Sequence, residues 1–267
     1  MTRLPAVAGT FYDDDPHRLK QQLAELIPSG LERQPAIGVV SPHAGYVYSG
    51  RVAGELFARL ELPATVIILG PNHHGRGARA ALSPDDDWLT PLGSVPIDRE
   101  LALLIQRRSP LVVEDREAHR YEHSLEVQLP FLQYLRADIR IVPLCLGFGD
   151  LESCQRLGNS LAAAITDYGK EVLILASSDM THYESALAAR QKDEQALDRL
   201  LALDAAGLHR VCREKRITMC GVIPAVTMLF AAKELGARNA QLIRYATSGE
   251  VTGDESSVVA YAAVTLS

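Results

Sequence analysis

The sequence predicts a single α/β domain in which helices flank a central, mostly parallel or mixed sheet. Two observations predict this class: short, continuously apolar segments recur along the chain, and segments with helical periodicity separate them. Continuous apolar segments are typical of strands covered on both faces, because neither face then meets water. Since no linker-like composition interrupts the 267 residues, we expect one domain over residues 1–267.

The strands and helices are expected to alternate along the chain. The apolar segments predict strands at residues 36–41, 65–70, 139–147 and 171–177, and more weakly at 240–246 and 257–265. Helices are expected at residues 15–27, 50–60, 98–107, 122–136, 151–167, 184–203, 205–214 and 222–236. The polar stretch at residues 83–94 is expected to be a surface excursion, because its three adjacent aspartates are costly to pack together.

The composition excludes several classes of protein. With 27 Lys and Arg against 33 Asp and Glu, the formal net charge is −6, and no basic block indicates nucleic-acid binding. No apolar run reaches the roughly 18 residues of a membrane helix, and the first residues lack a secretory signal. The four cysteines form no CxxC pair, so we expect free thiols and a cytoplasmic location. An apolar fraction of 47 % leaves room for a homodimer contact.

Histidine-bearing segments follow three of the predicted strands. PHAGYVY follows the first strand at residues 42–48, PNHHG follows the second at 71–75, and SDMTHY follows the fourth at 178–183. Open α/β sheets bind ligands at the carboxyl ends of their strands. We therefore expect these three segments to meet at one site.

His43 and His73 are the natural metal ligands in these segments. Neutral imidazole is the commonest protein ligand for zinc, copper and iron, and two imidazoles at equivalent strand ends favour a shared ion. The alternative is that each histidine only closes a loop by hydrogen bonding. His74 points in a different direction from its neighbour, so it is expected to contact substrate or a carboxylate instead.

Two further pairs combine an acid with an imidazole. His182 is expected to act as general acid or base, and Asp179 to orient an imidazole; alternatively, Asp179 caps the following helix. His123 and Glu126 lie three residues apart and would share a helix face, where they could serve as base and orienter. The alternative for this second pair is an ordinary helix start with acidic residues.

Cys220 precedes an apolar helix. A thiol at a helix N-terminus has a lowered pKa and is a better ligand or nucleophile, although most free cysteines are small buried apolar groups. The latter is expected of the other cysteines, which are Cys145, Cys154 and Cys212.

Six motifs together resemble one known family. They are PAVAGTFY (5–12), SPHAGYVYSG (41–50), LGPNHH (69–74), HSLEVQLPFL (123–132), SSDMTHY (177–183) and TMCG (218–221). This set resembles the Memo family, whose bacterial and archaeal members are also called protein B of the AmmeMemoRadiSam system. The resemblance implies a fold similar to class III extradiol dioxygenases, the non-haem iron enzymes that cleave catechol rings.

The resemblance also implies roles for individual residues. The metal ligands would be His43, His73 and Cys220, and His182 would match the acid/base histidine of the dioxygenases. The motif positions around the same cleft are Asp179, His123 and Glu126. Cys220 stands where the dioxygenases have a carboxylate, and a thiolate shifts the metal preference towards copper(I), zinc or thiolate-ligated iron.

Three functions follow as hypotheses. The first is a dioxygenase-like redox enzyme with one iron or copper ion, zinc being the alternative metal, acting on an unknown small substrate. The second is a non-enzymatic metal- or peptide-binding module, as implied by eukaryotic relatives described as signalling adaptors. In that case Tyr46, Tyr48 and His74 would bind an aromatic or phosphorylated peptide. The third is a zinc-dependent hydrolase whose base is Glu126 or His182. The system name implies a radical-SAM partner protein.

Overall fold

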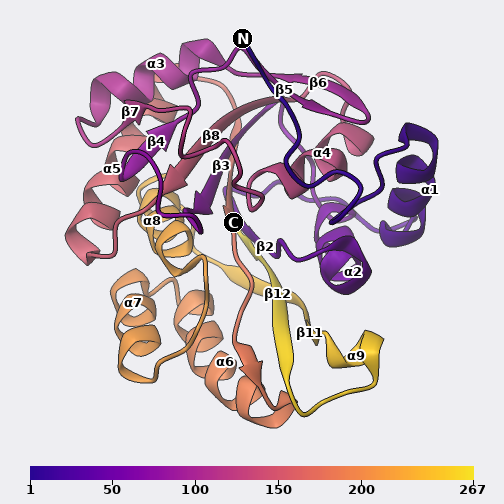
Figure 1. The fold of residues 1–267 in the computed structure, drawn as a ribbon. Coiled ribbons are helices and arrows are strands. Elements are labelled where there is room, and N and C mark those ends of the chain that lie inside the picture. The colour runs from indigo at the N-terminus through magenta and orange to yellow at the C-terminus, as the bar shows by residue number, and fades with distance from the viewer.

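In this computed structural model, which describes all of residues 1–267, a nine-stranded mixed sheet carries helices on both faces (Figure 1). Its strands, in spatial order, are β10 (His182–Glu184), β12 (Val258–Leu266), β2 (Gly38–Ser41), β9 (Val172–Ser177), β3 (Thr65–Pro71), β8 (Arg140–Leu146), β4 (Ala80–Leu82) and β7 (Val113–Glu114), and β11 (Ala240–Thr247) pairs with β12. The predicted α/β class is confirmed, and each of the six predicted strands is found within two residues of its expected bounds.

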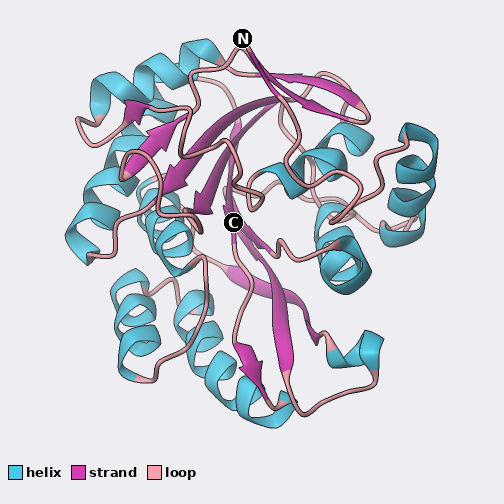
Figure 2. Ribbon diagram, viewed as in Figure 1, coloured by secondary structure: helices cyan, strands magenta, loops and turns pink.

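The helices divide between the two faces of this sheet (Figure 2). They are α1 (Pro16–Leu26), α2 (Tyr46–Phe57), α3 (Arg99–Arg108), α4 (Leu129–Leu135), α5 (Leu151–Tyr168), α6 (Ala186–Leu201), α7 (Ala205–Glu214), α8 (Val222–Glu234) and the short α9 (Gly249–Thr252). On one face α8 packs against α5 and the central strands, and on the other α2 packs against β11 and β12. None of these helices combines the length and the apolar character needed to cross a membrane.

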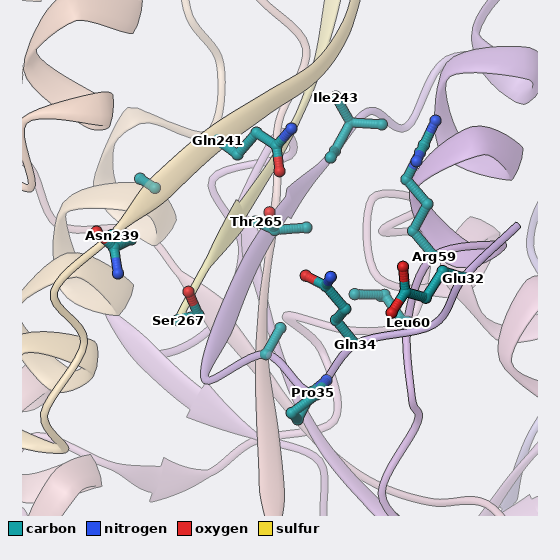
Figure 3. Close-up of a pocket in the computed structure, with 12 residues that line it drawn as sticks. Glu32, Gln34, Pro35, Arg59, Leu60, Asn239, Gln241, Ile243, Thr265 and Ser267 are labelled. Atoms are coloured by element: carbon teal, nitrogen blue, oxygen red, sulfur yellow. The ribbon is translucent and has the colours of Figure 1, made fainter.

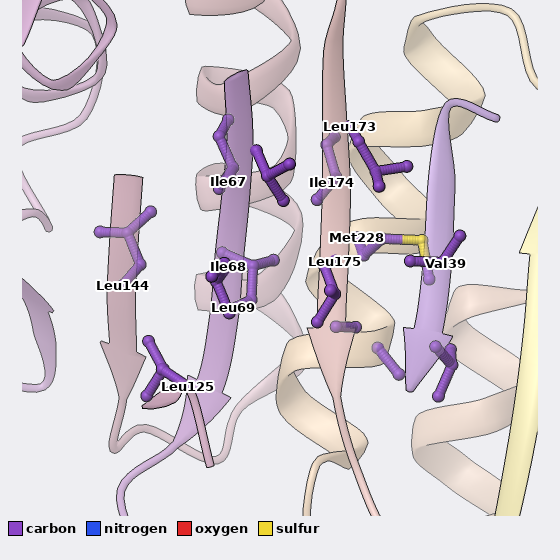
Figure 4. Packing of buried hydrophobic residues seen from close by; sticks show 14 of the residues in the cluster. Val39, Ile67, Ile68, Leu69, Leu125, Leu144, Leu173, Ile174, Leu175 and Met228 are labelled. Atoms are coloured by element: carbon purple, nitrogen blue, oxygen red, sulfur yellow. The ribbon is translucent and has the colours of Figure 1, made fainter. Parts of the chain in front are cut away.

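The centre of the sheet is parallel and buried on both faces. Strands β2, β9, β3 and β8 pair in parallel, so their carboxyl ends reach the same edge of the sheet. Met228 reaches from α8 to Val39 on β2 (Figure 4), and Gly38 leaves the space for it. A Cβ atom on Gly38 would lie 2.5 Å from the Met228 sulfur. This contact fixes α8 against the start of β2, and α8 packs on β9 and β3 as well.

The helix predicted at residues 122–136 is much shorter than expected. Residues 122–125 form a loop and a turn, Glu126–Gln128 form a 3₁₀ turn (η1), and the α-helix begins only at Leu129. Pro130 lies in the first turn of α4, where its missing N–H leaves no hydrogen bond unmade. His123 and Glu126 therefore do not share the face of an α-helix.

The prediction of a surface excursion at residues 83–94 is wrong. Residues Asp87–Thr90 (β5) and Gly93–Pro96 (β6) form a hairpin, and Thr2–Arg3 (β1) adds to β5 as a third strand. Trp88 is fully buried in this small sheet. The three aspartates do not pack together, because each has its own partner. These partners are Arg116 for Asp85, Arg99 for Asp86 and Ser94 for Asp87.

A buried cluster joins the small sheet to the rest of the molecule. The guanidinium of Arg3 lies 4.0 Å from the centre of the Trp88 ring, and the His119 ring meets the same indole edge-on at 5.5 Å. Nε2 of His119 bonds the carbonyl of Ala81 at 3.0 Å, and its Nδ1 has no partner. Burial, with Arg3 nearby, lowers the pKa of His119 from 6.5 to about 4.

His119 should make the stability of the protein depend on pH. Between pH 6.5 and about 4 the unfolded chain binds a proton that the folded chain excludes, so the free energy of unfolding falls as the pH falls through this window. Over this window His119 lowers the free energy of unfolding by about 3 kcal/mol. Urea unfolding of wild type and His119→Gln at several pH values measures it. The stability difference between the two proteins should shrink towards pH 4, and parallel curves would contradict the assignment.

Candidate metal centre

Three imidazoles converge at the carboxyl edge of the central strands. His43 follows β2, His73 follows β3, and His123 lies in the loop before η1. Their ligand nitrogens all lie within 4.8 Å of one another. The rings are 4.8 to 5.5 Å apart between centroids. The parallel packing of β2, β9 and β3 thus brings together residues that are far apart in the sequence.

The ring of His43 is held by a serine at the end of β9. Ser177 donates its single hydroxyl proton to the carbonyl of Ser124 at 2.6 Å and accepts from the side-chain amide of Gln128 at 2.9 Å. The hydroxyl therefore also accepts from Nδ1 of His43, at 2.9 Å. We assign this tautomer from the hydrogen-bond network. It leaves Nε2 of His43 unprotonated, and burial lowers the pKa of this imidazole.

The ring of His73 is held by a carboxylate. Glu122 accepts from Nδ1 of His73 at 2.8 Å and from its backbone N–H at 2.7 Å. Burial raises the pKa of the Glu122 carboxyl, but the bonds from His73 and from Ser124 N–H outweigh burial and bring it to about 2. An ionised carboxylate only accepts, so Nε2 of His73 is the nitrogen left free. Metal-bound histidines almost always donate their second N–H in this way.

His123 completes the cluster as a neutral ring. It stacks on His73 with an interplanar angle of 21° and meets the ring of Phe11 at 4.8 Å. Burial lowers the pKa of His123 to about 4, even though the charge of Glu122 acts in the opposite direction. His43 and His123 are therefore both unprotonated near neutral pH, which is the state in which imidazole binds a cation.

Cys220 lies beside the cluster. Its sulfur is 3.1 Å from Nε2 of His43 and accepts from the backbone N–H of Asp179 at 3.2 Å. Gly221 permits this approach, since a Cβ there would lie 2.2 Å from the carbonyl of Ser177. Burial and the charge of Asp179 raise the pKa of the thiol, so the lowering expected from the N-terminus of α8 is not found. The other three cysteines are buried and free, as predicted.

Asp179 has a different contact from the one expected. Its carboxylate accepts from the backbone N–H of His43 at 2.8 Å and does not bond an imidazole. Asp179 therefore joins the ends of β2 and β9, and burial raises the pKa of its carboxyl. Nor does it cap the following helix, because Ser185 is the residue that caps α6.

His182 lies in β10 and bonds Thr218, two residues before Cys220. Its backbone N–H donates to Oγ1 of Thr218 at 2.8 Å, and its Nδ1 donates to the carbonyl of Thr218 at 3.0 Å. A carbonyl only accepts, so this bond keeps the proton on Nδ1 and leaves the lone pair on Nε2. The ring is thus held in the tautomer that a general base requires.

Glu126 is committed to the N-terminal segment, so the expectation that it pairs with His123 as a base is not met. The fully buried carboxylate accepts from the guanidinium of Arg3 at 2.7 Å and from the hydroxyl of Tyr12 at 2.7 Å. It also accepts from the backbone N–H groups of Ala6 and Val7. No oxygen of this carboxylate is left for a reacting group.

Of the three expected substrate-binding residues, Tyr46 is not accessible. It is the first residue of α2, is 2 % exposed, packs against Phe131, and donates its hydroxyl proton to the carbonyl of Val127 at 2.7 Å. Tyr48 is 43 % exposed, and His74 is exposed with its Nε2 bonded to the carbonyl of Tyr121. Only Tyr48 and His74 remain open to a ligand.

Sequence reasoning missed the groups that hold the imidazoles, namely Glu122, Ser177 and Gln128. Glu122 is adjacent to His123 in the sequence, and its acidic side chain was the one available signal. Two glutamates lie in the helix predicted at residues 122–136, and helical spacing from His123 favours Glu126. Ser177 ends an apolar strand and carries no signal in its spacing.

A separate hollow lies at the opposite end of β2 (Figure 3). It has a volume of about 280 Å³, is bordered by Gln34, Arg59, Gln241 and Thr265 among others, and contains no histidine. Because Pro35 and Ala36 lie just before the first residue of β2, this hollow is not part of the histidine cluster.

Comparison with known proteins agrees with the arrangement of these motifs along the chain. The family profile described as "Memo-like protein" matches residues 3–265. The chain belongs to the Memo family. The resemblance predicted from the six motifs is thereby confirmed.

Several archaeal members of the Memo family are similar over their full length. The MEMO1 family protein of Methanosarcina barkeri is 45 % identical over 265 residues, which cover 98 % of each chain. That of Methanopyrus kandleri is 42 % identical over 278 residues, covering 99 % of this chain and 98 % of the relative. That of Pyrobaculum arsenaticum is 43 % identical over 274 residues, with 98 % of each chain covered.

One solved structure shares the fold of this Memo family chain. It is the crystal structure of an uncharacterized protein from Escherichia coli K12, with a TM-score of 0.58 and 16 % sequence identity. The match covers 85 % of this chain and 98 % of that chain. At this identity the likeness shows a common fold.

Proposed function

We propose that the protein holds one transition-metal ion through His43, His73 and Cys220, with His123 as an adjacent imidazole. The observation that supports this proposal is the hydrogen bonding of two rings: Ser177 and Glu122 accept from Nδ1 of His43 and His73, so Nε2 of each ring carries the lone pair within one histidine cluster, and the Cys220 sulfur lies against that of His43. The donor set fits such an ion, because ligand atoms with bonds of about 2.0 to 2.3 Å to one metal lie about 3 to 4 Å apart. The 3.1 Å between the Cys220 sulfur and Nε2 of His43 falls in this range.

We further propose that the site catalyses a redox reaction on a small substrate. A bound iron or copper ion would supply electron transfer and Lewis acidity at an open position. Nε2 of His182 would take the proton of the substrate, and the carbonyl of Thr218 would stabilise the resulting imidazolium through Nδ1–H. His43 and His123 stay neutral because burial lowers their pKa, so neither competes for that proton.

The contacts of two residues favour a redox enzyme over a zinc hydrolase and over a peptide-binding module. A zinc hydrolase that used Glu126 as its base is disfavoured, because the carboxylate is fully engaged with Arg3 and the N-terminal segment. A peptide-binding module that used Tyr46 is disfavoured, because its ring is buried. His182 is the base that remains for either kind of catalysis.

Metal analysis and oxygen consumption test the proposal. Protein prepared without oxygen should contain close to one iron or copper per chain, and Cys220→Ser should lose it, while the control Cys212→Ser keeps it because Cys212 is buried in α7. The metal-loaded wild type should then consume oxygen with a catecholic substrate. If it neither consumes oxygen nor changes the oxidation state of its metal with any reductant or substrate, the redox function is wrong. Bound zinc without a redox response would favour the hydrolase.

A further inference from the structure

Arg3 connects the small sheet to the loop that carries Glu122 and His123. Its side chain is only 4 % exposed. Nε donates to the carbonyl of His119 at 2.9 Å, Nη2 to the carbonyl of Glu122 at 2.7 Å, and Nη1 to the carboxylate of Glu126 at 2.7 Å. One guanidinium thus bonds three points of the segment 119–126: its first residue, Glu122 in its middle and its last residue.

The small sheet holds Arg3 in turn. Strand β1 pairs in parallel with β5 so that Arg3 lies opposite Trp88, and the guanidinium stacks over the indole at 4.0 Å. The planar fork of an arginine can stack on a ring and donate in three directions at once, whereas a lysine offers a single charged nitrogen. The position therefore requires arginine for its geometry as well as for its charge.

The residues held by Arg3 determine where an imidazole points. The backbone of Glu122 is fixed through its carbonyl, and its carboxylate accepts two bonds from His73. Arg3 itself bonds none of the proposed metal ligands. A shift of the Glu122 backbone would move the acceptor of the His73 Nδ1 proton, and with it the direction of Nε2.

We infer that Arg3 is a positioning residue of the metal centre, which acts through Glu122 on the orientation of His73. The small sheet thereby has a role in the site, since β1 and β5 hold Arg3 in register. The effect of Arg3 on metal affinity rests on the proposed function, but its effect on the His73 ring does not. The two are therefore measured separately.

The first measurement uses the metal-free protein. In protein labelled with ¹⁵N-histidine, the His73 Nδ1 proton should exchange with solvent at least about tenfold faster in Arg3→Lys and Arg3→Met than in wild type, because displacing its charged acceptor weakens a hydrogen bond of this size. The control is Arg99→Met. Arg99 donates to the carbonyls of Pro84 and Asp85 beside the same sheet, and its hydrogen bonds do not reach the loop. An unchanged His73 signal in a folded Arg3 variant would overturn the inference.

Arg3→Lys retains a charge opposite Glu126, so it keeps the test available if Arg3→Met does not fold. If Arg3 contributed only to stability, Arg3→Lys and Arg99→Met would change the exchange rate of the His73 proton equally wherever they lower the free energy of unfolding equally. Such equality would also overturn the inference.

The second measurement is a titration with cobalt(II). Arg3→Lys should raise the dissociation constant about tenfold and alter the visible absorption of the bound cobalt, as changes behind a metal ligand do. Arg99→Met should stay within about twofold of wild type on the same reasoning. If wild type binds no cobalt, the proposed metal function is contradicted, while the exchange of the His73 proton still decides the role of Arg3.

Discussion

Replacing His73 with alanine is expected to remove the bound metal ion. The variant loses one of the two imidazoles whose Nε2 is freed by a fixed acceptor on Nδ1, and it leaves the Glu122 carboxylate without its principal partner. We expect metal affinity to fall at least about 100-fold, beyond the 10- to 100-fold typical of losing a residue behind a ligand. The metal content of purified protein, measured together with a zinc or iron(II) titration, provides the test.

The adjacent histidine supplies a matched control for this experiment. His74 is exposed, bonds the carbonyl of Tyr121 through Nε2, and lies outside the cluster of ligand nitrogens. His74→Ala should therefore keep the metal content of wild type. Equal loss of metal in both variants would show that the binding site includes His74, and retention of metal in His73→Ala would contradict the proposed ligand set.

Replacing Glu126 with alanine is expected to be strongly destabilising. The carboxylate and Arg3 form an ion pair whose side chains are 0 % and 4 % exposed, so removing one partner leaves a buried charge without compensation. Such a change costs about 3 to 5 kcal/mol of the free energy of unfolding. The N–H groups of Ala6 and Val7 and the hydroxyl of Tyr12 lose their acceptor in the same variant. Urea unfolding monitored by circular dichroism measures the loss.

An ion pair at the surface gives the comparison for Glu126. Arg244 bonds Glu55, and both side chains are 30 % exposed. Glu55→Ala should cost no more than about 1 kcal/mol, because solvent screens the remaining charge. If Glu55→Ala and Glu126→Ala lower the free energy of unfolding equally, the buried network around Glu126 does not carry the stability assigned to it here.

The sequence by itself determined the fold class, the main strands and the three strand ends that carry histidines. Strand β3, at Thr65–Pro71, was predictable because all its residues are buried, so it appears as an uninterrupted apolar segment. The convergence of His43 and His73 was predictable because parallel strands bring their carboxyl ends to the same edge. The motifs, taken together, also identified the Memo family.

Only the tertiary structure decided which neighbouring groups serve the site. Glu122 and Glu126 are chemically identical in the sequence, but the loop turns the first towards His73 and the second towards Arg3, 123 residues away along the chain. Tyr46 was placed in the cleft by its motif, yet the first turn of α2 directs its ring into the core.

The same holds for the small sheet. In this sheet Thr2–Arg3 pairs with residues more than eighty positions later in the chain. The local pattern of the acidic segment at residues 83–94 does not predict that pairing. The spacing of apolar residues along the chain indicates which residues are buried. Which atom accepts which proton depends on contacts between distant segments, and those exist only once the chain has folded.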